Sequence, residues 1–186
     1  MSHAVAASSL GVIGAPARRM PARYWISLAI LAALPDADVV AFAFGVPQGH
    51  VLGHRGITHS LAFAAVVAAL AVRLLFRDAA WHRAWSRLWL MYFVAIASHG
   101  VLDAMTTGGR GIAFFAPFTD ARWHFGWRPI LVSPIGVAAF ISMYGLQVLR
   151  NELVWVWLPS ALVALVARFW RLRGEVGRVG QVGQVG

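Results

Sequence analysis

Long apolar runs alternate along the chain with short polar, proline-containing or glycine-rich segments, and the two-residue alternation of a half-buried strand is missing. The runs predict an all-α, membrane-embedded bundle of about five to six helices. Gly14 and Pro16 end the first run, Pro35 breaks the second, Thr58 is placed to cap the third, and Pro159 kinks the last. The predicted helices cover residues 3–14, 24–34, 58–76, 88–105, 133–149 and 152–170.

Two connecting segments and the C-terminal tail lack this apolar character. Residues 45–57 form a glycine-rich loop, and residues 106–129 form a longer loop that contains several aromatic side chains. The tail repeats short units of Val, Gly and Gln, a low-complexity composition that is typical of disorder. We therefore predict one helical domain over residues 1–173, followed by a disordered tail over residues 174–186.

The composition supports a location in the membrane. Only 12% of the residues are charged, about half of the roughly 25% found in soluble domains, and the mean hydropathy is +0.69. The N-terminus lacks the basic segment of a secretory signal peptide, so we expect the first helix to be retained. The chain contains no cysteine, so it has no disulfide framework and any metal must be held by His and carboxylate.

The net charge of +9 comes from sixteen basic residues, all arginine. Such a charge is also found in nucleic-acid-binding proteins, but no motif of that kind is present. Arginines at the ends of apolar helices instead anchor them at the cytoplasmic face of a membrane. We therefore predict a multi-pass protein of a bacterial inner membrane, with membrane lipids and no nucleic acid as partners.

The acidic and histidine side chains are few, and their positions along the predicted helices are informative. Neighbouring helices that run antiparallel bring the start of one beside the end of the previous one. This path places the arginines near residues 18–23 and 73–87 at one end of the bundle. It gathers seven other side chains at the opposite end: His3, Asp36, Asp38, His54, His59, His99 and Asp103.

The last helix adds a constraint on the topology. Its C-terminal arginines belong at the arginine end, so Glu152 at its start belongs at the histidine end. Residues 134–149 then have no room to cross the bundle completely. We predict that they form a surface or re-entrant helix, or that the chain doubles back there.

Imidazole and carboxylate together suit Zn²⁺, Mn²⁺ or Fe²⁺, and seven candidate ligands exceed the needs of one ion. Each carboxylate inside a membrane helix costs roughly 2.5–3.5 kcal/mol, a cost that bound cations would offset. We predict a hydrolase for a phosphoester or related bond in a small molecule or lipid. It would hold two or more ions, Zn²⁺ or Mn²⁺, that activate water. Asp38 or Glu152 is the candidate general base, and Arg55 or Arg110 the candidate site for a substrate phosphate.

Simpler interpretations exist for each element. The acidic pair Asp36 and Asp38 could mark a helix stop, a single histidine could cap a helix, and His99 could bond Asp103 within one helix. A metal-transport or metal-storing protein, or a membrane scaffold with a structural ion, would also use these residues. Transport requires polar groups along a path at the membrane midplane, whereas these groups gather at one end.

Four sequence motifs carry a family resemblance: LPDAD, HRGITHSL, SHGVLDAMTTGG and a following loop with APF. Together they resemble the YdjM-like family of membrane-bound, metal-dependent hydrolases over about residues 3–160. The resemblance implies that the His and Asp of these motifs are metal ligands, with His3 matching an early family histidine. In this sequence the implied motif ligands are Asp36, Asp38, His54, His59, His99 and Asp103.

Overall fold

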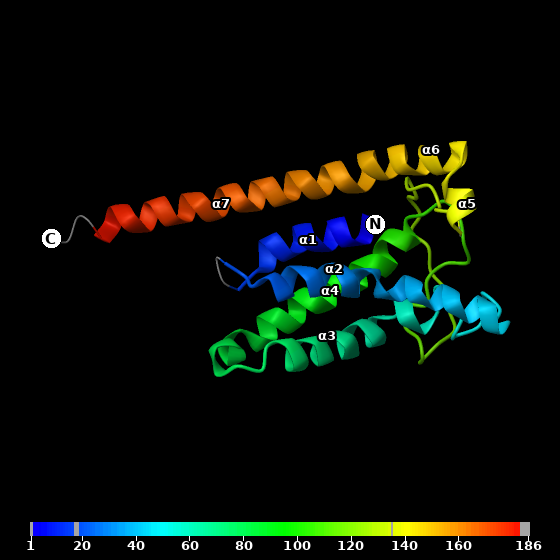
Figure 1. Cartoon of the computed structure of the whole chain (residues 1–186), viewed down its shortest axis with the longest axis horizontal. Helices are drawn as coiled ribbons and strands as arrows, with labels where there is room; N and C mark the ends of the chain where they lie inside the picture. The colour runs from blue at the N-terminus through cyan, green and yellow to red at the C-terminus, as the bar shows by residue number, and fades with distance from the viewer. Residues whose placement is uncertain (1, 17–18, 135, 183–186) are drawn as a thin grey trace.

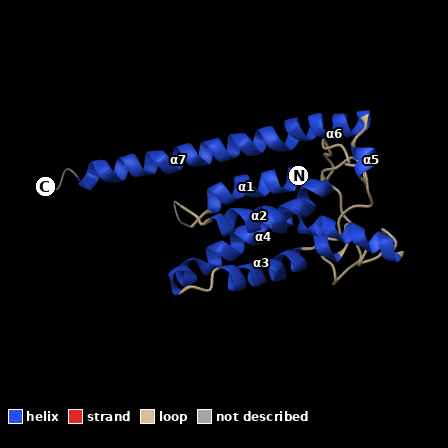
Figure 2. Cartoon of the chain, in the orientation of Figure 1, coloured by secondary structure: helices blue, strands red, loops and turns tan. Residues whose placement is uncertain are grey.

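The computed structural model describes residues 2–16, 19–134 and 136–182, and these residues form an all-helical bundle without a strand. The predicted fold class is therefore confirmed (Figures 1 and 2). Two helical stretches, Ala22–Phe44 and Met143–Arg171, are long and apolar enough to cross a membrane. Two isolated bridges, Thr106 with Ile130 and Ile112 with Trp123, are the only extended pairings in the described chain.

The first helices follow the predicted bounds, except at Pro35. Helix α1 spans Ser2–Gly14 and α2 spans Ala22–Ala33. The chain does not break at Pro35 but tightens into a 3₁₀ segment, η1, which spans Leu34–Phe44. Proline is tolerated in a first turn because its missing N–H has no helical partner there. Gly45, with a φ of 73°, ends the segment in the left-handed conformation that glycine adopts easily.

The next two helices form an antiparallel pair. A short 3₁₀ turn, η2 (Ile57–His59), precedes α3, which spans Leu61–Leu75, and α4 spans Trp85–Ala104 after the 3₁₀ segment η3 (Ala79–Ala84). Thr58 was predicted to cap α3, and this prediction is wrong. The cap is Ser60, whose Oγ accepts a hydrogen bond of 3.1 Å from Phe63 N. The Thr58 hydroxyl is turned toward Asp38 instead.

The C-terminal part differs more from the prediction. A short helix, α5 (Val137–Phe140), is followed by α6 (Met143–Glu152), the π-helical segment η4 (Leu153–Trp157) and α7 (Leu158–Val182). The last three join into one long helix without a break at Pro159, which lies just after the π turn. The tail that was predicted to be disordered continues α7 to Val182, and residues 183–186 lie outside the described residues.

The core lies between α1, α2, α3 and α4. Helix α1 packs against α2, α4 and α7, and α3 packs against α4. Large aromatic side chains such as Tyr24, Phe76 and Tyr92 are fully buried. Small residues such as Ala64 and Ala68 allow α3 to approach α4 closely. Helix α7 touches the bundle along α1 and leaves a broad apolar surface exposed, as expected for a helix that faces lipid.

The two ends of the bundle have different chemistry. At the C-terminal end of α1, Arg87 donates to Gly14 O at 2.9 Å, and Arg171 donates to Ile13 O at 2.7 Å. These guanidinium groups satisfy helix carbonyl groups and complement the negative end of the helix dipole. At the opposite end, the N-terminus of α1 meets the end of α4, η1 and η2 (Figure 1). Glu152 also lies at that end, beside Ser2, as the topology argument predicted.

Candidate metal centre

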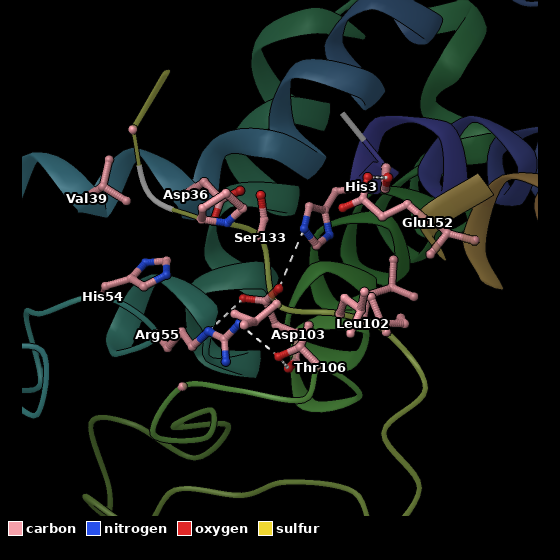
Figure 3. A pocket seen from close by; sticks show the side chains of 18 of the residues that line it. His3, Asp36, Val39, His54, Arg55, Leu102, Asp103, Thr106, Ser133 and Glu152 are labelled. Atoms are coloured by element: carbon pink, nitrogen blue, oxygen red, sulfur yellow. Dashed lines mark hydrogen bonds and ion pairs between the residues drawn. The ribbon is translucent and has the colours of Figure 1, made fainter. Parts of the chain in front are cut away.

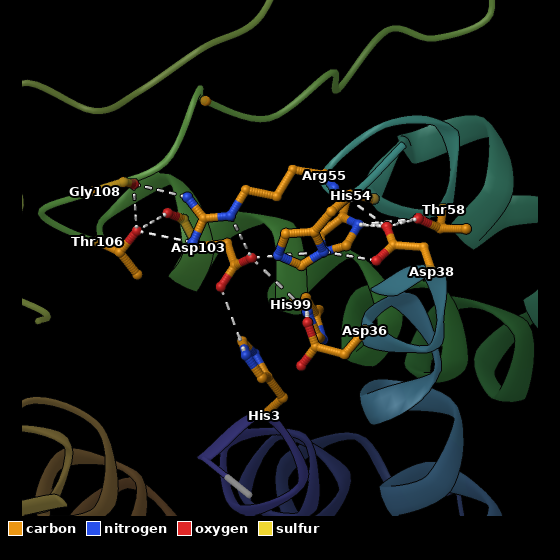
Figure 4. Close-up of polar contacts among 12 residues, drawn as sticks. His3, Asp36, Asp38, His54, Arg55, Thr58, His99, Asp103, Thr106 and Gly108 are labelled. Atoms are coloured by element: carbon orange, nitrogen blue, oxygen red, sulfur yellow. Dashed lines mark hydrogen bonds and ion pairs between the residues drawn. The ribbon is translucent and has the colours of Figure 1, made fainter. Parts of the chain in front are cut away.

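The seven predicted ligands lie together at one end of the bundle, although they come from five parts of the chain. All of them except His59 are labelled in Figure 4. Helix α1 contributes one, η1 two, the loop before η2 one, η2 one and α4 two. In chain order, these seven residues are His3, Asp36, Asp38, His54, His59, His99 and Asp103. Tertiary packing therefore produces the convergence that the helix order predicted.

Four of these side chains form an inner group that we call the His/Asp centre: Asp36, His59, His99 and Asp103. One potential ligand atom from each lies within 4.8 Å of all the others. His99 Nε2 is 3.2 Å from Asp36 Oδ1 and 4.0 Å from Asp103 Oδ2, and His59 Nε2 is 3.5 Å from Asp103 Oδ2. Asp36 is half exposed, whereas the other three are buried, so the centre is open on one side.

The two imidazoles of the centre are held from behind. His99 Nδ1 donates to Ala32 O at 2.7 Å, and His59 Nδ1 lies 3.2 Å from Asp38 Oδ2. These contacts leave Nε2 of both rings buried, without a hydrogen-bond partner and aimed at the carboxylates. Buried nitrogen atoms are rarely left unpaired, whereas a metal-binding histidine commonly has one anchored and one free nitrogen.

The dimensions of the centre fit a divalent cation. An ion with tetrahedral ligand bonds of about 2.0–2.1 Å separates neighbouring ligand atoms by about 3.3 Å. Three of the six separations among these ligand atoms are 3.2, 3.5 and 4.0 Å, close to that value, and all six are below 4.8 Å. A set of two imidazole nitrogens and two carboxylate oxygens suits Zn²⁺, Mn²⁺ or Fe²⁺.

A second group lies directly behind the first and shares His59 with it: Asp38, His54 and His59. Asp38 is buried and accepts hydrogen bonds from His54 Nδ1 at 2.6 Å and from Thr58 Oγ1 at 2.6 Å. The backbone N–H of Arg55 also donates to Asp38, at 3.2 Å. Both carboxylate oxygens are therefore engaged, and Asp38 fixes the orientation of the two imidazoles.

Arg55 is buried beside the centre, and all three nitrogens of its guanidinium group have a protein partner. Its Nε lies 3.2 Å from Asp103 Oδ2, and its terminal nitrogens donate to Gly108 O at 2.9 Å and Thr106 Oγ1 at 3.1 Å. Its φ of 64° lies in the left-handed region, which costs a non-glycine residue about 1 kcal/mol or more. The contacts that hold Arg55 in this conformation also hold the Asp103 carboxylate in place.

The electrostatics of His59 follow from its two acidic neighbours. Burial lowers the pKa of His59, but its contacts with the Asp103 and Asp38 carboxylates outweigh burial and raise the pKa to about 9. The ring therefore acts as a positive partner between two carboxylates. A divalent cation bound by Nε2 would take over this role by displacing the proton.

His3 lies against the inner group, at a distance from Asp103 that is similar to the distances within the group. Its ring stacks on His99 with centroids 3.5 Å apart, and its Nε2 is 3.7 Å from Asp103 Oδ1. Its Nδ1 is buried without a hydrogen-bond partner. The N-terminus of α1 thus lies against one side of the centre, where the His3 ring stacks on the His99 ring and helps to hold its orientation.

The centre opens into a cavity of about 460 Å³ (Figure 3), within the usual size range of a small-molecule site. Its wall combines polar side chains of the site, including His3, Asp36 and Asp103, with apolar residues of α4 and of the segment 130–134. Glu152 also lines the cavity, on the side of His3, and its carboxylate accepts a hydrogen bond from Ser2 Oγ. The lining of the cavity therefore combines the charged side chains of the centre, the Glu152 carboxylate and apolar side chains.

Four further residues bear on the site: Arg110, which was predicted as a substrate contact, and Thr58, Thr106 and Arg122, which were not predicted as site residues. Arg110 is exposed, with its guanidinium beside Gly49, and it is not among the residues that line the cavity. Sequence reasoning missed Thr58 and Thr106, which bond the acids and Arg55, and Arg122, which donates to His50 O at 3.0 Å. The spacing HRGITH placed Thr58 next to two candidate ligands, which was the available signal for that residue.

The chain was compared with known proteins. The family model described as YdjM inner membrane protein matches residues 1–174. The inner membrane protein YbcI of Escherichia coli (strain K12) is 42% identical over 174 residues, which make up 93% of this chain and 98% of the relative. No solved structure matches the chain. These descriptions give a location and name neither an activity nor a substrate.

Proposed function

Because the chain belongs to the YdjM inner membrane protein family, as its motifs predicted, we propose that it is a metal-dependent hydrolase of the inner membrane. It acts on a phosphoester or a related bond. One observation carries the proposal: two buried imidazoles present unpaired Nε2 atoms to two carboxylates, on the floor of a cavity. A purely structural network would leave no buried nitrogen unpaired at its centre.

The residues that hold the ion are Asp36, His59, His99 and Asp103. A divalent cation at this place lowers the pKa of water and stabilises the negative charge that develops on the substrate. The mixed nitrogen and oxygen ligands favour Zn²⁺ or Mn²⁺. A second ion at Asp38, His54 and His59 would have to break the 2.6 Å contact between His54 and Asp38, so we assign that group an orienting role.

The chain's own side chains then have distinct tasks. Asp38 orients His54 and His59 by hydrogen bonds, and Arg55 fixes Asp103. Glu152 lines the same cavity as the His/Asp centre, and we assign its carboxylate the role of general base. Asp38 is less suited to that task, because both of its oxygens already accept hydrogen bonds.

The experiment begins with elemental analysis of the full chain, purified in detergent. We expect about one equivalent of a transition metal and hydrolysis of at least one class in a screen of phosphomonoesters, phosphodiesters and phospholipids. The variant His99→Ala should lose both metal and activity. The matched control is His124→Ala, which replaces an exposed loop histidine and should keep both.

Two results would contradict the proposal. Protein without metal, even after incubation with Zn²⁺ or Mn²⁺, would exclude the ion. Tight metal binding with no hydrolysis in any class, together with unfolding on chelation, would favour the alternative of a non-catalytic metal-binding protein. Metal flux into vesicles that contain the protein would favour transport.

A further inference from the structure

A second, apolar groove lies next to the cavity of the His/Asp centre. Its volume is about 250 Å³, and it is formed by α1, α4, η4 and α7. Two residues, Leu102 and Val156, line both the groove and the larger cavity. The two spaces therefore adjoin at these side chains, and a molecule that leaves the centre between them enters the groove.

The chemistry changes abruptly across this boundary. The cavity is lined by charged groups, including Asp36, Asp103 and Glu152. The described lining of the groove carries no charged side chain and is made of aliphatic, tryptophan, proline and serine residues: Ala6, Ser9, Leu10, Ser98, Val101, Trp155, Pro159, Ser160 and Val163, with the two shared residues. A ligand that fills both spaces has a charged part and an apolar part.

The direction of the groove matches the direction of a lipid in a bilayer. It begins at the histidine end, at Leu102 and Val156, and runs beside α7 to Val163. The eight residues from Val156 in η4 to Val163 in α7 extend over about 10 Å at a rise of 1.5 Å per residue. The groove thus follows the helix axes away from the polar end, as an acyl chain leaves its headgroup and enters the hydrocarbon core.

The groove also opens toward the apolar outer surface. Beyond it, α7 exposes Leu158, Leu162, Leu165 and Phe169, a surface that suits contact with lipid chains rather than water. Trp155 and Val163, on the groove wall, are themselves 43% and 42% exposed. A lipid chain can therefore enter the groove sideways from the membrane without crossing a polar layer.

We propose that the substrate is a membrane lipid with a phosphoester headgroup, whose acyl chain lies in the groove while the scissile bond lies at the His/Asp centre. This inference rests on the proposed hydrolase function and specifies its substrate class. A water-soluble phosphoester would leave the groove unused. The acyl chain enters the groove from the bilayer and not from water, so the groove recognises it through packing contacts along its length rather than through dehydration.

The test uses the full chain in phosphatidylcholine nanodiscs that contain phosphatidic acid with a diazirine on its acyl chain. After illumination, mass spectrometry maps the labelled residues. We expect labelling to concentrate on residues 6–10, 98–102 and 155–163. The variant Val163→Trp, which fills the groove, should remove most of this labelling, because the indole occupies the space of the acyl chain.

The matched control is Val166→Trp on the same helix. Val166 is 45% exposed, close to the 42% of Val163, but it does not line the groove, so its labelling should equal that of the native chain. Metal content and thermal unfolding of both variants show that they fold. Equal loss in the two variants, or label spread evenly over the exposed face of α7, would overturn the inference.

The same samples separate this inference from the hydrolase proposal. If the groove is labelled in protein that binds no metal, the result would support the lipid site and contradict the hydrolase proposal. The protein could instead hydrolyse glycerol 3-phosphate, with metal, as fast as phosphatidic acid and show no groove labelling. That result would support the hydrolase proposal and contradict the lipid substrate. Faster hydrolysis with longer acyl chains, lost in Val163→Trp, would support both.

Discussion

Replacing Arg55 by Met tests whether the buried guanidinium holds the centre together. The side chains of Arg55 and Asp103 are only 5% and 9% exposed, and their contact is 3.2 Å long. The variant removes the guanidinium from the Asp103 carboxylate, which keeps only the His59 ring as a positive neighbour, and it removes one donor each from Gly108 O and Thr106 Oγ1. The methionine stem fills much of the same space, so the loss is mainly one of charge and hydrogen bonds.

The magnitude follows from the burial of the pair. Breaking a buried ion pair by removing one partner costs about 3–5 kcal/mol. For a chain of this size, each 1 kcal/mol changes the unfolding midpoint by about 2–4 °C, so we expect a decrease of about 6–20 °C. The decrease should be smaller with saturating Zn²⁺, because a cation beside Asp103 replaces part of the missing charge.

Thermal unfolding of the full chain in detergent, followed by tryptophan fluorescence, measures the effect. The control Arg110→Met removes an exposed arginine and should change stability by less than about 0.5 kcal/mol, or about 2 °C. Arg55→Lys keeps the charge but not the planar fork, so its midpoint should lie between those of Arg55→Met and the native chain. A midpoint for Arg55→Met within about 2 °C of the native value would refute the reasoning.

Three further predictions concern the same centre. Asp38→Asn should weaken Zn²⁺ binding by about 10–100-fold without unfolding the chain, because His59 loses its anchor; competition with a fluorescent chelator measures this. Gly109→Ala should lower the unfolding midpoint, because φ is 86° and the new Cβ would meet the Arg55 guanidinium; an unchanged midpoint would show that the loop yields freely. Zn²⁺ affinity should fall as the pH is lowered from 8 to about 6, because protons compete for the imidazole nitrogens; calorimetry at several pH values checks this, and a flat profile would argue against histidine ligands.

Much of the fold was predictable because it depends on local signals. Apolar runs bounded by glycine and proline predicted the helices, and short connections made consecutive helices antiparallel neighbours. Membership of a membrane family followed from composition and motifs. The helix order also predicted that His3, His59, His99 and the acids would share one end, because the direction of each helix fixes which end its first residue reaches.

Local elements whose energies compete closely were not predictable. Pro35 could end α2 or begin a 3₁₀ turn, and only the packing of η1 against η2 and α4 selects the second. Thr58 and Ser60 both suit a helix cap, and the nearby Asp38 takes the Thr58 hydroxyl, which leaves the cap to Ser60. Pro159 was expected to kink the chain, but it lies within one long helix, just after a π turn.

The sequence by itself determined that this chain is a helical membrane protein with histidine and aspartate gathered at one end, because helix length, polarity and direction are encoded along the chain. Only the tertiary structure decided which nitrogen of each ring is free. His59 is anchored by Asp38 and His99 by Ala32 O, while Arg55 is committed to Asp103. These contacts join segments far apart in the chain, and their formation depends on the register in which the helices pack, which no local pattern specifies.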